Sequence, residues 1–495
     1  MSPSPEKSTF RRRAAILVGL VTFFSFLYFY EGGGWNQNSR FDLLRAIIER
    51  HTLQIDAYHE NTQDKAHFRG HYYSDKAPGL VFLAVPFALA ARPVLRSAGV
   101  DPQSPRGELA LSYIVGAATA ALPAALGGMC LFYLGLRLTG NPSAAAFGTV
   151  ILCLATPLWA YASLFWAHAL VGACLISSFA CALEARDSQS ARGDFLWALS
   201  LGLAAGWATV TEYPAAPASS MLALFALWQV WGRGVAARWR VVAGVGLGAA
   251  ICVIVLLCYL HSAFGTFRPS YSYYDPNSFT FMQRQGYMGL TYPHPDRLLK
   301  ILFGCSRGLF FASPVLVFAV WGLWRLGKEN VHRAAAFLAA AIVSYYFLFN
   351  ASFYWWKAGL SFGPRYAGAS FPLLCVGLAM AWARATRAWR RVLIATGLWG
   401  MFIALMVVST TSQLPMQDSC PIAHMVWPAF WSGHVALNRE SMLLASEGKY
   451  GAFNLGQLMG LHGLVSLIPL LAMWGIAALV WWKMMRVERG LEPSS

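Results

Sequence analysis

The stretch that decides the fold of this chain is RRRAAILVGLVTFFSFLYFY, residues 11–30, in which an apolar run directly follows three arginines. A helix needs about 20 largely apolar residues to cross a bilayer, and the run from Ala14 to Tyr30 approaches that length. The run ends in bulky residues and lacks the small-residue cleavage site of a signal peptide, so we predict a retained membrane anchor. Because Lys and Arg are retained in the cytoplasm, this arginine cluster predicts a cytoplasmic N-terminus.

The composition of the whole chain supports a polytopic membrane protein. The sequence has 495 residues, of which 57% are hydrophobic and 12% are charged, with a mean hydropathy of +0.47. Such values are far from those of soluble domains. The formal net charge of +16 comes mostly from basic residues between apolar runs, so it indicates membrane orientation and not nucleic-acid binding.

Apolar runs of spanning length predict an all-α protein with about 12 transmembrane helices. They cover residues 14–30, 110–136, 143–161, 164–184, 194–212, 214–232, 241–263, 301–325, 333–350, 366–383, 391–410 and 461–482. Every segment that this order places on the cytoplasmic side is basic. In chain order, these segments carry Arg137; Arg186 and Arg192; Arg233, Arg238 and Arg240; Arg325, Lys328 and Arg333; Arg384, Arg387, Arg390 and Arg391; and Lys483, Arg486 and Arg489. Both termini are therefore predicted to be cytoplasmic.

This orientation divides the chain into one membrane domain, residues 14–483, between cytoplasmic tails at 1–13 and 484–495. The predicted outer loops cover 31–109, 264–300, 351–365 and 411–460, and they hold most of the unusual polar residues. The apolar stretch 79–98 contains Pro86 and Pro93, which interrupt it as a span. We predict an interfacial helix there, because a further span would turn every later basic loop outward.

The first outer loop combines titratable and aromatic residues. Its segment FDLLRAIIERH has apolar residues at helical spacing, which predicts an amphipathic interfacial helix. The carboxylates Asp56, Asp64 and Asp75 follow, with Tyr73 and Lys76 beside the last. A solvated connector is the simplest interpretation, but the interleaved aromatic residues favour a packed loop. A carboxylate there could act as general base, and cations could bind a phosphate.

Two other outer segments carry exceptions to the charge rule. The hairpin 350–368 places Lys357 and Arg365 on the outer side, where an anionic lipid phosphate would explain them; an interfacial anchor is the alternative. The segment 265–314 is aromatic and suits a sugar, and its Arg307 is either a phosphate ligand or a snorkelling arginine. His168 and Glu212 lie at outer span ends and are supporting candidates.

The nine cysteines show no metal-ligand spacing. We interpret most of them as small buried apolar residues. Cys305 and Cys420 lie near span ends, and a disulfide between them is left open.

Several of these motifs resemble the GT-C superfamily, namely its branch of protein O-mannosyltransferases and lipid A aminoarabinose transferases. NSRFDLLRA is similar to the branch's first-loop motif around Arg40, YYSDKAPG to its second around Lys76, and WWKAGLSFGPRY to a hairpin of uncharacterised relatives. The chain departs from the branch where that has its catalytic aspartate, since Gln37 and Asn38 stand there.

The resemblance implies a bacterial inner-membrane enzyme that transfers one sugar, with inversion, from a polyprenyl-phosphate donor to a lipid, glycan or protein acceptor on the outer face. The base would be Asp64, or else Asp56. Arg40, Lys76, Lys357 and Arg365 would bind the donor phosphate, supported by Asp75, Tyr73, Glu212 and His168. Nothing resembles the metal site of the oligosaccharyl-transferring relatives, so neither a metal nor another cofactor is expected.

Two other classes of function stay open. A transporter or flippase for a lipid-linked or small anionic substrate also has about twelve spans, although its polar site would normally lie at mid-membrane. A scaffold without catalytic activity is the third reading, because the expected aspartate is missing.

Overall fold

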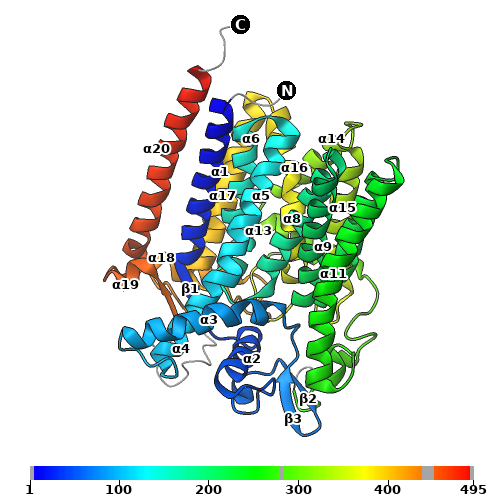
Figure 1. Ribbon diagram of the computed structural model, residues 1–495. Helices are drawn as coiled ribbons and strands as arrows, with labels where there is room; N and C mark the ends of the chain where they lie inside the picture. Colours follow the sequence, from blue (N-terminus) through cyan, green and yellow to red (C-terminus); the bar gives the residue numbers. More distant parts are fainter. Residues whose placement is uncertain (1–4, 279–282, 438–450, 491–495) are drawn as a thin grey trace.

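The computed structural model describes residues 5–278, 283–437 and 451–490. It is a bundle of long helices in which α1 (Pro5–Leu27) and α20 (Ile468–Gly490) lie at one edge (Figure 1). Parts of the predicted tails and outer loops, at residues 1–4, 279–282, 438–450 and 491–495, lie outside the described residues.

The helices follow the predicted spans in order. After α1 they are α4 (Pro105–Gly116), η2 (Ala117–Ala121) and α5 (Leu122–Thr139); α6 (Pro142–Leu154) and α7 (Leu158–Ala162); α8 (Ala167–Asp187); α9 (Ala191–Thr211); η3 (Tyr213–Ala215) and α10 (Ala216–Gln229); α11 (Val235–Phe264); α12 (Pro295–Phe303), α13 (Leu309–Ala312) and α14 (Leu316–Leu326); α15 (Arg333–Ser352); η6 (Arg365–Ser370) and α16 (Phe371–Arg384); α17 (Arg387–Thr410); and η9 (Gly463–Leu467) with α20. Within the described residues, eight helices are long and apolar enough to cross a membrane. The all-α, multi-pass prediction is confirmed.

Two predicted spans are not continuous helices. Residues 143–161 divide between α6 and α7, and 301–325 is interrupted twice. Residues 301–325 divide among α12, α13 and α14, because the backbone turns at Gly304 and Gly308. A Cβ on Gly308 would lie 2.4 Å from the carbonyl oxygen of Gly304, so this turn requires glycine. Cys305 and Arg307 lie in the turn between α12 and α13, and Arg307 is buried there.

Helix α3 (Gly79–Ser97) belongs to the first loop and not to the upright bundle. Its length and composition would allow it to span, but it lies across the end of the bundle beside α2 (Trp35–Arg50) (Figure 1). Pro86 and Pro93 do not break it, contrary to the sequence prediction, since α3 is helical through both. Its orientation is that of the predicted interfacial helix.

Two short antiparallel strand pairs complete the fold. Strand β1 (Phe29–Glu31) pairs with β4 (Ala452–Asn454), and β2 (Lys65–Phe68) pairs with β3 (His71–Ser74). The turn between β2 and β3 consists of Arg69 and Gly70, both with positive φ, as a two-residue hairpin prefers. The hairpin carries the chain directly into the SDKAPG motif.

The two ends of the bundle differ in content. The start of α1 and the end of α20 lie at one end, whereas α2, α3, α4, β2 and β3 gather at the other (Figure 1). The elements of the first predicted outer loop therefore lie opposite the two termini.

Inside the bundle, α14 and α16 meet backbone to backbone. A Cβ on Gly322 would lie 1.8 Å from the carbonyl oxygen of Gly377, and a Cβ on Gly377 would lie 2.0 Å from that of Ala319. Only glycine permits such close approach of two helices.

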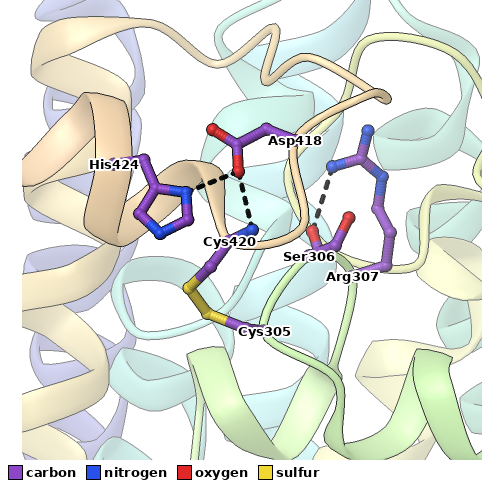
Figure 2. Close-up of a disulfide and its surroundings, with 6 residues drawn as sticks. All are labelled: Cys305, Ser306, Arg307, Asp418, Cys420 and His424. Carbon is purple, nitrogen blue, oxygen red and sulfur yellow. Dashed lines mark hydrogen bonds and ion pairs between the residues drawn. A yellow bond between two sulfur atoms is a disulfide. The ribbon is translucent and has the colours of Figure 1, made fainter.

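A disulfide joins Cys305 to Cys420, so the pairing that the sequence left open is present, with 4.8 Å between the two Cα atoms (Figure 2). It ties the turn after α12 to the segment 411–420 that follows α17. Asp418 braces this segment by accepting hydrogen bonds from the backbone N–H of Cys420 and from His424 Nδ1, both at 2.8 Å.

Candidate functional site

Lys76, just after β3, lies between two carboxylates. Its Nζ is 2.8 Å from Asp64 Oδ2 and 3.1 Å from Asp75 Oδ2. Burial lowers the pKa of Lys76, but the two carboxylates outweigh it, and the pKa is raised above its ordinary value. Burial also raises the pKa of Asp75, to about 6, against the attraction of Lys76. The lysine is thus held protonated and fixed in direction.

Arg40 is buried on α2, with 3% of its surface exposed. Its Nη1 donates to the backbone oxygen of Asn36 at 3.2 Å and to the Asn36 side chain, while its Nε finds no hydrogen-bond acceptor among the described residues. Burial lowers its pKa, although the nearby charges of Glu212, Asp75 and Asp64 act to raise it. The guanidinium is therefore close to the Lys76 cluster without being paired to it.

Arg365 begins η6 and is 8% exposed. Its guanidinium carbon lies 4.7 Å from the ring centroid of Trp166 and 5.6 Å from that of Tyr366, and no described residue accepts a hydrogen bond from its Nε. Across the described ranges, neither Arg365 nor Arg40 forms a salt bridge with a carboxylate. Two buried guanidinium groups thus retain hydrogen-bonding capacity for an anion.

The buried His168 and the partly buried Glu212 form a pair beside these arginines. Glu212 ends α9, just before Pro214, and its Oε1 lies 2.8 Å from Nδ1 of His168 near the start of α8. Arg40 and Arg365 both interact electrostatically with the pair. Five separate parts of the chain therefore meet in one charged cluster.

We call this set the outer cluster. It consists of Arg40, Asp64, Asp75, Lys76, His168, Glu212 and Arg365. All seven were predicted site residues, so the structure brings together most of the set that the sequence proposed.

Three predicted residues lie outside the outer cluster. Asp56 is largely exposed and bonds His71 Nδ1 at 2.7 Å and the Tyr72 N–H at 2.6 Å, which stabilises the β2–β3 hairpin. Tyr73 packs its ring 5.0 Å from that of Phe264. Lys357 donates from Nζ to the carbonyl oxygen of Met416 at 2.7 Å and shares only its hairpin with Arg365.

Arg307 differs from both sequence interpretations. It is 1% exposed, which excludes snorkelling, and its guanidinium is already bonded to backbone oxygens, which excludes a free phosphate ligand. The acceptors are the carbonyls of Lys357, Ser306, Gly359, Leu414 and Pro415, at 3.0–3.4 Å. Figure 2 shows it next to the disulfide. Arg307 thus fastens the 357–359 loop, and with it the Arg365 hairpin, to the segment 411–420.

Sequence reasoning missed the buried Glu31 and did not predict the contacts of the buried Gln37. Glu31 accepts hydrogen bonds from the Thr411 hydroxyl and the Ser412 N–H, both at 2.6 Å, and burial raises its pKa to about 7. Gln37 donates to the Gly33 carbonyl at 2.6 Å and accepts from the Phe165 N–H at 2.8 Å. An acid at the end of an apolar run is a signal that would have drawn attention to Glu31.

No three His, Cys, Asp or Glu side chains are placed to hold a metal ion among the residues that the structure describes. The expectation that no metal is required stays a prediction. The chemistry that the outer cluster does offer is recognition of an anion by guanidinium and ammonium groups, with a histidine and carboxylates at hand for proton transfer.

A bundle of long helices, with further helices and charged loops gathered at one end, is a multi-pass membrane architecture, as the sequence predicted. ArnT from Cupriavidus metallidurans in the apo state shares this fold, with a TM-score of 0.50 and 16% identity, over 77% of this chain and 61% of that chain. ArnT from the same organism bound to undecaprenyl phosphate gives a TM-score of 0.52 and 16% identity, over 82% and 71% of the two chains.

This likeness establishes the fold. The chain spans about 61% of the length of the apo ArnT chain that it matches. No family model matches it, and no curated protein matches it in sequence.

Proposed function

We propose that this chain is an integral membrane glycosyltransferase that moves a single sugar from a polyprenyl-phosphate donor to a lipid, glycan or protein acceptor. The observation that carries the proposal is the presence near Lys76 of two buried arginines, Arg40 and Arg365, that pair with no carboxylate among the residues described. Burying unpaired guanidinium groups is costly, so a bound anion is the expected compensation. The ArnT structure with the same fold contains undecaprenyl phosphate, which supports a lipid phosphate as that anion.

In this proposal Arg40, Lys76 and Arg365 bind the donor phosphate, and Lys357 borders the site on the hairpin of Arg365. The guanidinium groups suit bidentate contacts to phosphate oxygens, and Lys76 adds a point charge fixed by Asp64 and Asp75. Each charge-assisted hydrogen bond is worth about 2 kcal/mol. These groups would stabilise the phosphate as it leaves the anomeric carbon.

Direct displacement by an acceptor hydroxyl would invert the anomeric carbon. It requires a group that takes the hydroxyl proton and a surface that holds the sugar. Asp64 is the candidate base that the first loop contributes. Tyr271, whose ring centroid lies 5.9 Å from Lys76 Nζ, begins an aromatic surface suited to the sugar.

The disulfide supports placing the outer cluster on the outer face of the membrane. Disulfides persist in oxidising compartments such as the bacterial periplasm. The disulfide joins Cys305 to Cys420 in the segment 411–420, and Arg307 joins this segment to the hairpin of Arg365. Together with the basic loops, this favours a bacterial inner membrane with both termini in the cytoplasm.

The test is a transfer assay with the purified chain in nanodiscs. Undecaprenyl-phosphate glucose, mannose and aminoarabinose would be offered with lipid A, oligosaccharide and peptide acceptors. Transfer by the wild type, together with binding of undecaprenyl phosphate, is the expected result. Flipping of the donor across vesicles without transfer would establish the transporter alternative, and absence of both activities would establish a scaffold.

A further inference from the structure

We propose that His168, oriented by Glu212, takes the proton of the acceptor hydroxyl. This inference rests on the proposed function and deepens it, because it assigns the base within the outer cluster to a pair that the first loop does not supply. It concerns the residues of α8 and α9, not those of the hairpin β2–β3.

The geometry of the pair fits a general base. Glu212 contacts Nδ1 of His168, at 2.8 Å from Oε1 and 3.1 Å from Oε2. A carboxylate at Nδ1 holds the proton there and leaves the lone pair on Nε2. Within the described part of the chain, the hydrogen bond and ion pair of His168 both run through Nδ1 to Glu212, and none runs through Nε2. The nitrogen that can accept a proton is therefore the one that the protein leaves unused.

The position of His168 is fixed by the first loop. Gln37 binds the Gly33 carbonyl with its Nε2 and receives the Phe165 N–H at its Oε1, so it links the entrance of α2 to the residues just before α8. The ring of His168 lies 5.7 Å from that of Tyr161 and 6.1 Å from that of Trp166. These contacts present the imidazole beside Arg365, whose guanidinium covers the same Trp166 ring.

The carboxylates of the first loop have another task. Asp64 and Asp75 both contact the ammonium group of Lys76, at 2.8 Å and 3.1 Å. Protonating either one during the reaction would remove a contact that orients a phosphate ligand at the moment when negative charge develops there. Glu212 has the opposite effect, because its negative charge stabilises the imidazolium that His168 becomes.

In the proposed transfer step, the acceptor O–H bond breaks and its proton passes to His168 Nε2, while the acceptor oxygen forms a bond to the anomeric carbon. The bond from that carbon to the phosphate oxygen breaks, and its electron pair stays on the departing polyprenyl phosphate between Arg40 and Arg365. The imidazolium then returns its proton to water.

The experiment compares His168→Gln with wild type and with His261→Gln, a matched change at an exposed histidine of α11. The donor and acceptor pair that the transfer assay identifies is used, with undecaprenyl phosphate binding as a separate readout. We expect kcat of His168→Gln to fall at least about 100-fold, the contribution of a general base, with binding within about threefold of wild type. His261→Gln should match wild type in both.

The pH profile provides a readout that a structural role would not move. The groups that face His168 are Glu212, Arg40, Arg365 and Tyr161. In Glu212→Gln the histidine loses its carboxylate, so we expect the acidic limb of kcat/KM to move to lower pH with kcat reduced about tenfold or more. This variant decides the matter if His168→Gln fails to fold.

Three results would overturn the inference. The first is a His168→Gln enzyme with kcat within about threefold of wild type. The second is a Glu212→Gln enzyme with an unchanged acidic limb. The third is a wild type that transfers no sugar, which removes the proposed function as well, so the two failures are distinguished by the wild-type assay.

Discussion

The two ends of helix α9 each carry a carboxylate in an ion pair, but the surroundings differ. Asp194, in the first turn, is fully buried and receives Arg233 Nη2 at 2.9 Å and Arg240 Nη2 at 3.0 Å. Glu212, at the other end, bonds His168, while Arg40 and Arg365 nearby have no carboxylate partner in the described part of the chain.

The comparison separates a structural cluster from a candidate binding site. Arg233 and Arg240 each form an ion pair with one carboxylate oxygen of Asp194. These ion pairs join the start of α9 to the segment after α10 and to α11. In the outer cluster Lys76 is paired with Asp64 and Asp75, but the two arginines form no salt bridge among the described residues. A buried charge without a partner lowers stability, so the two arginines are candidates for binding an anion.

The largest expected effect is on turnover at Arg365. Arg365→Ala removes charge-assisted contacts to the donor phosphate, so transfer should fall at least about 100-fold, or about 3 kcal/mol. Lys76→Ala should likewise abolish transfer. Expression and thermal stability should be retained in both, which fluorescence-detection chromatography and a melting scan would check. Near-normal turnover in both variants would remove the phosphate assignment.

The opposite result is expected at the other end of α9. Asp194→Ala leaves two arginine heads without their carboxylate and removes a favourable charge from a helix N-terminus, so unfolding should become easier by roughly 2 kcal/mol. The kcat of the folded fraction should not change. Chemical denaturation in detergent, with a turnover assay on the same sample, measures both. Loss of kcat at unchanged stability would contradict the structural role.

The pKa of Asp75 gives a smaller, pH-dependent effect. Because the folded-state pKa is raised to about 6, its stabilising contribution is present below pH 4 or so and is lost as pH rises through about 6. Over the same interval Asp75 gains negative charge beside Lys76, so affinity for a polyprenyl-phosphate sugar should fall roughly tenfold. A phosphodiester donor is used because its own charge does not titrate here. Asp75→Asn should flatten the profile, and an unchanged slope would exclude Asp75.

Lys357→Ala should have the smallest effect. Its ammonium group is already bonded to the Met416 carbonyl, and no contact joins it to the outer cluster in the described residues. We expect kcat/KM within about threefold of wild type, the value of one partly exposed contact. A loss as large as that of Arg365→Ala would show that Lys357 binds the phosphate and that the hairpin moves when the donor arrives.

Hydropathy predicted the helices of the fold well, because the thickness of the bilayer limits helix length. The orientation that the basic loops indicate stays a prediction. The prediction of continuous helices failed within 301–325, where Gly304 and Gly308 permit a turn inside an apolar segment. At Pro86 and Pro93 the sequence predicted an interruption, whereas α3 is helical through both residues.

The candidate site was predictable as a set of residues and not as a network. Lys76 and Asp75 are neighbours in sequence, so their contact was foreseeable, but His168 and Glu212 come from different helices and their pairing depends on packing. The hydrogen bonds of Arg307 to backbone oxygens could not be predicted, because main-chain acceptors leave no trace in the sequence. Gln37 was noted only for the carboxylate that it lacks, and its bond to Phe165 appears only in three dimensions.

The glycine contact between α14 and α16 limits how the molecule can open. Gly322 and Gly377 bring the backbones of α14 and α16 into contact. These two helices cannot slide past each other or separate without losing that contact, so we expect them to move as one unit. In the proposed function, the isoprenoid chain of the donor would therefore enter and leave between other helices. Engineered cross-links across this contact should leave lipid exchange at full speed, and a bulkier residue at either glycine should distort the bundle without widening that entrance.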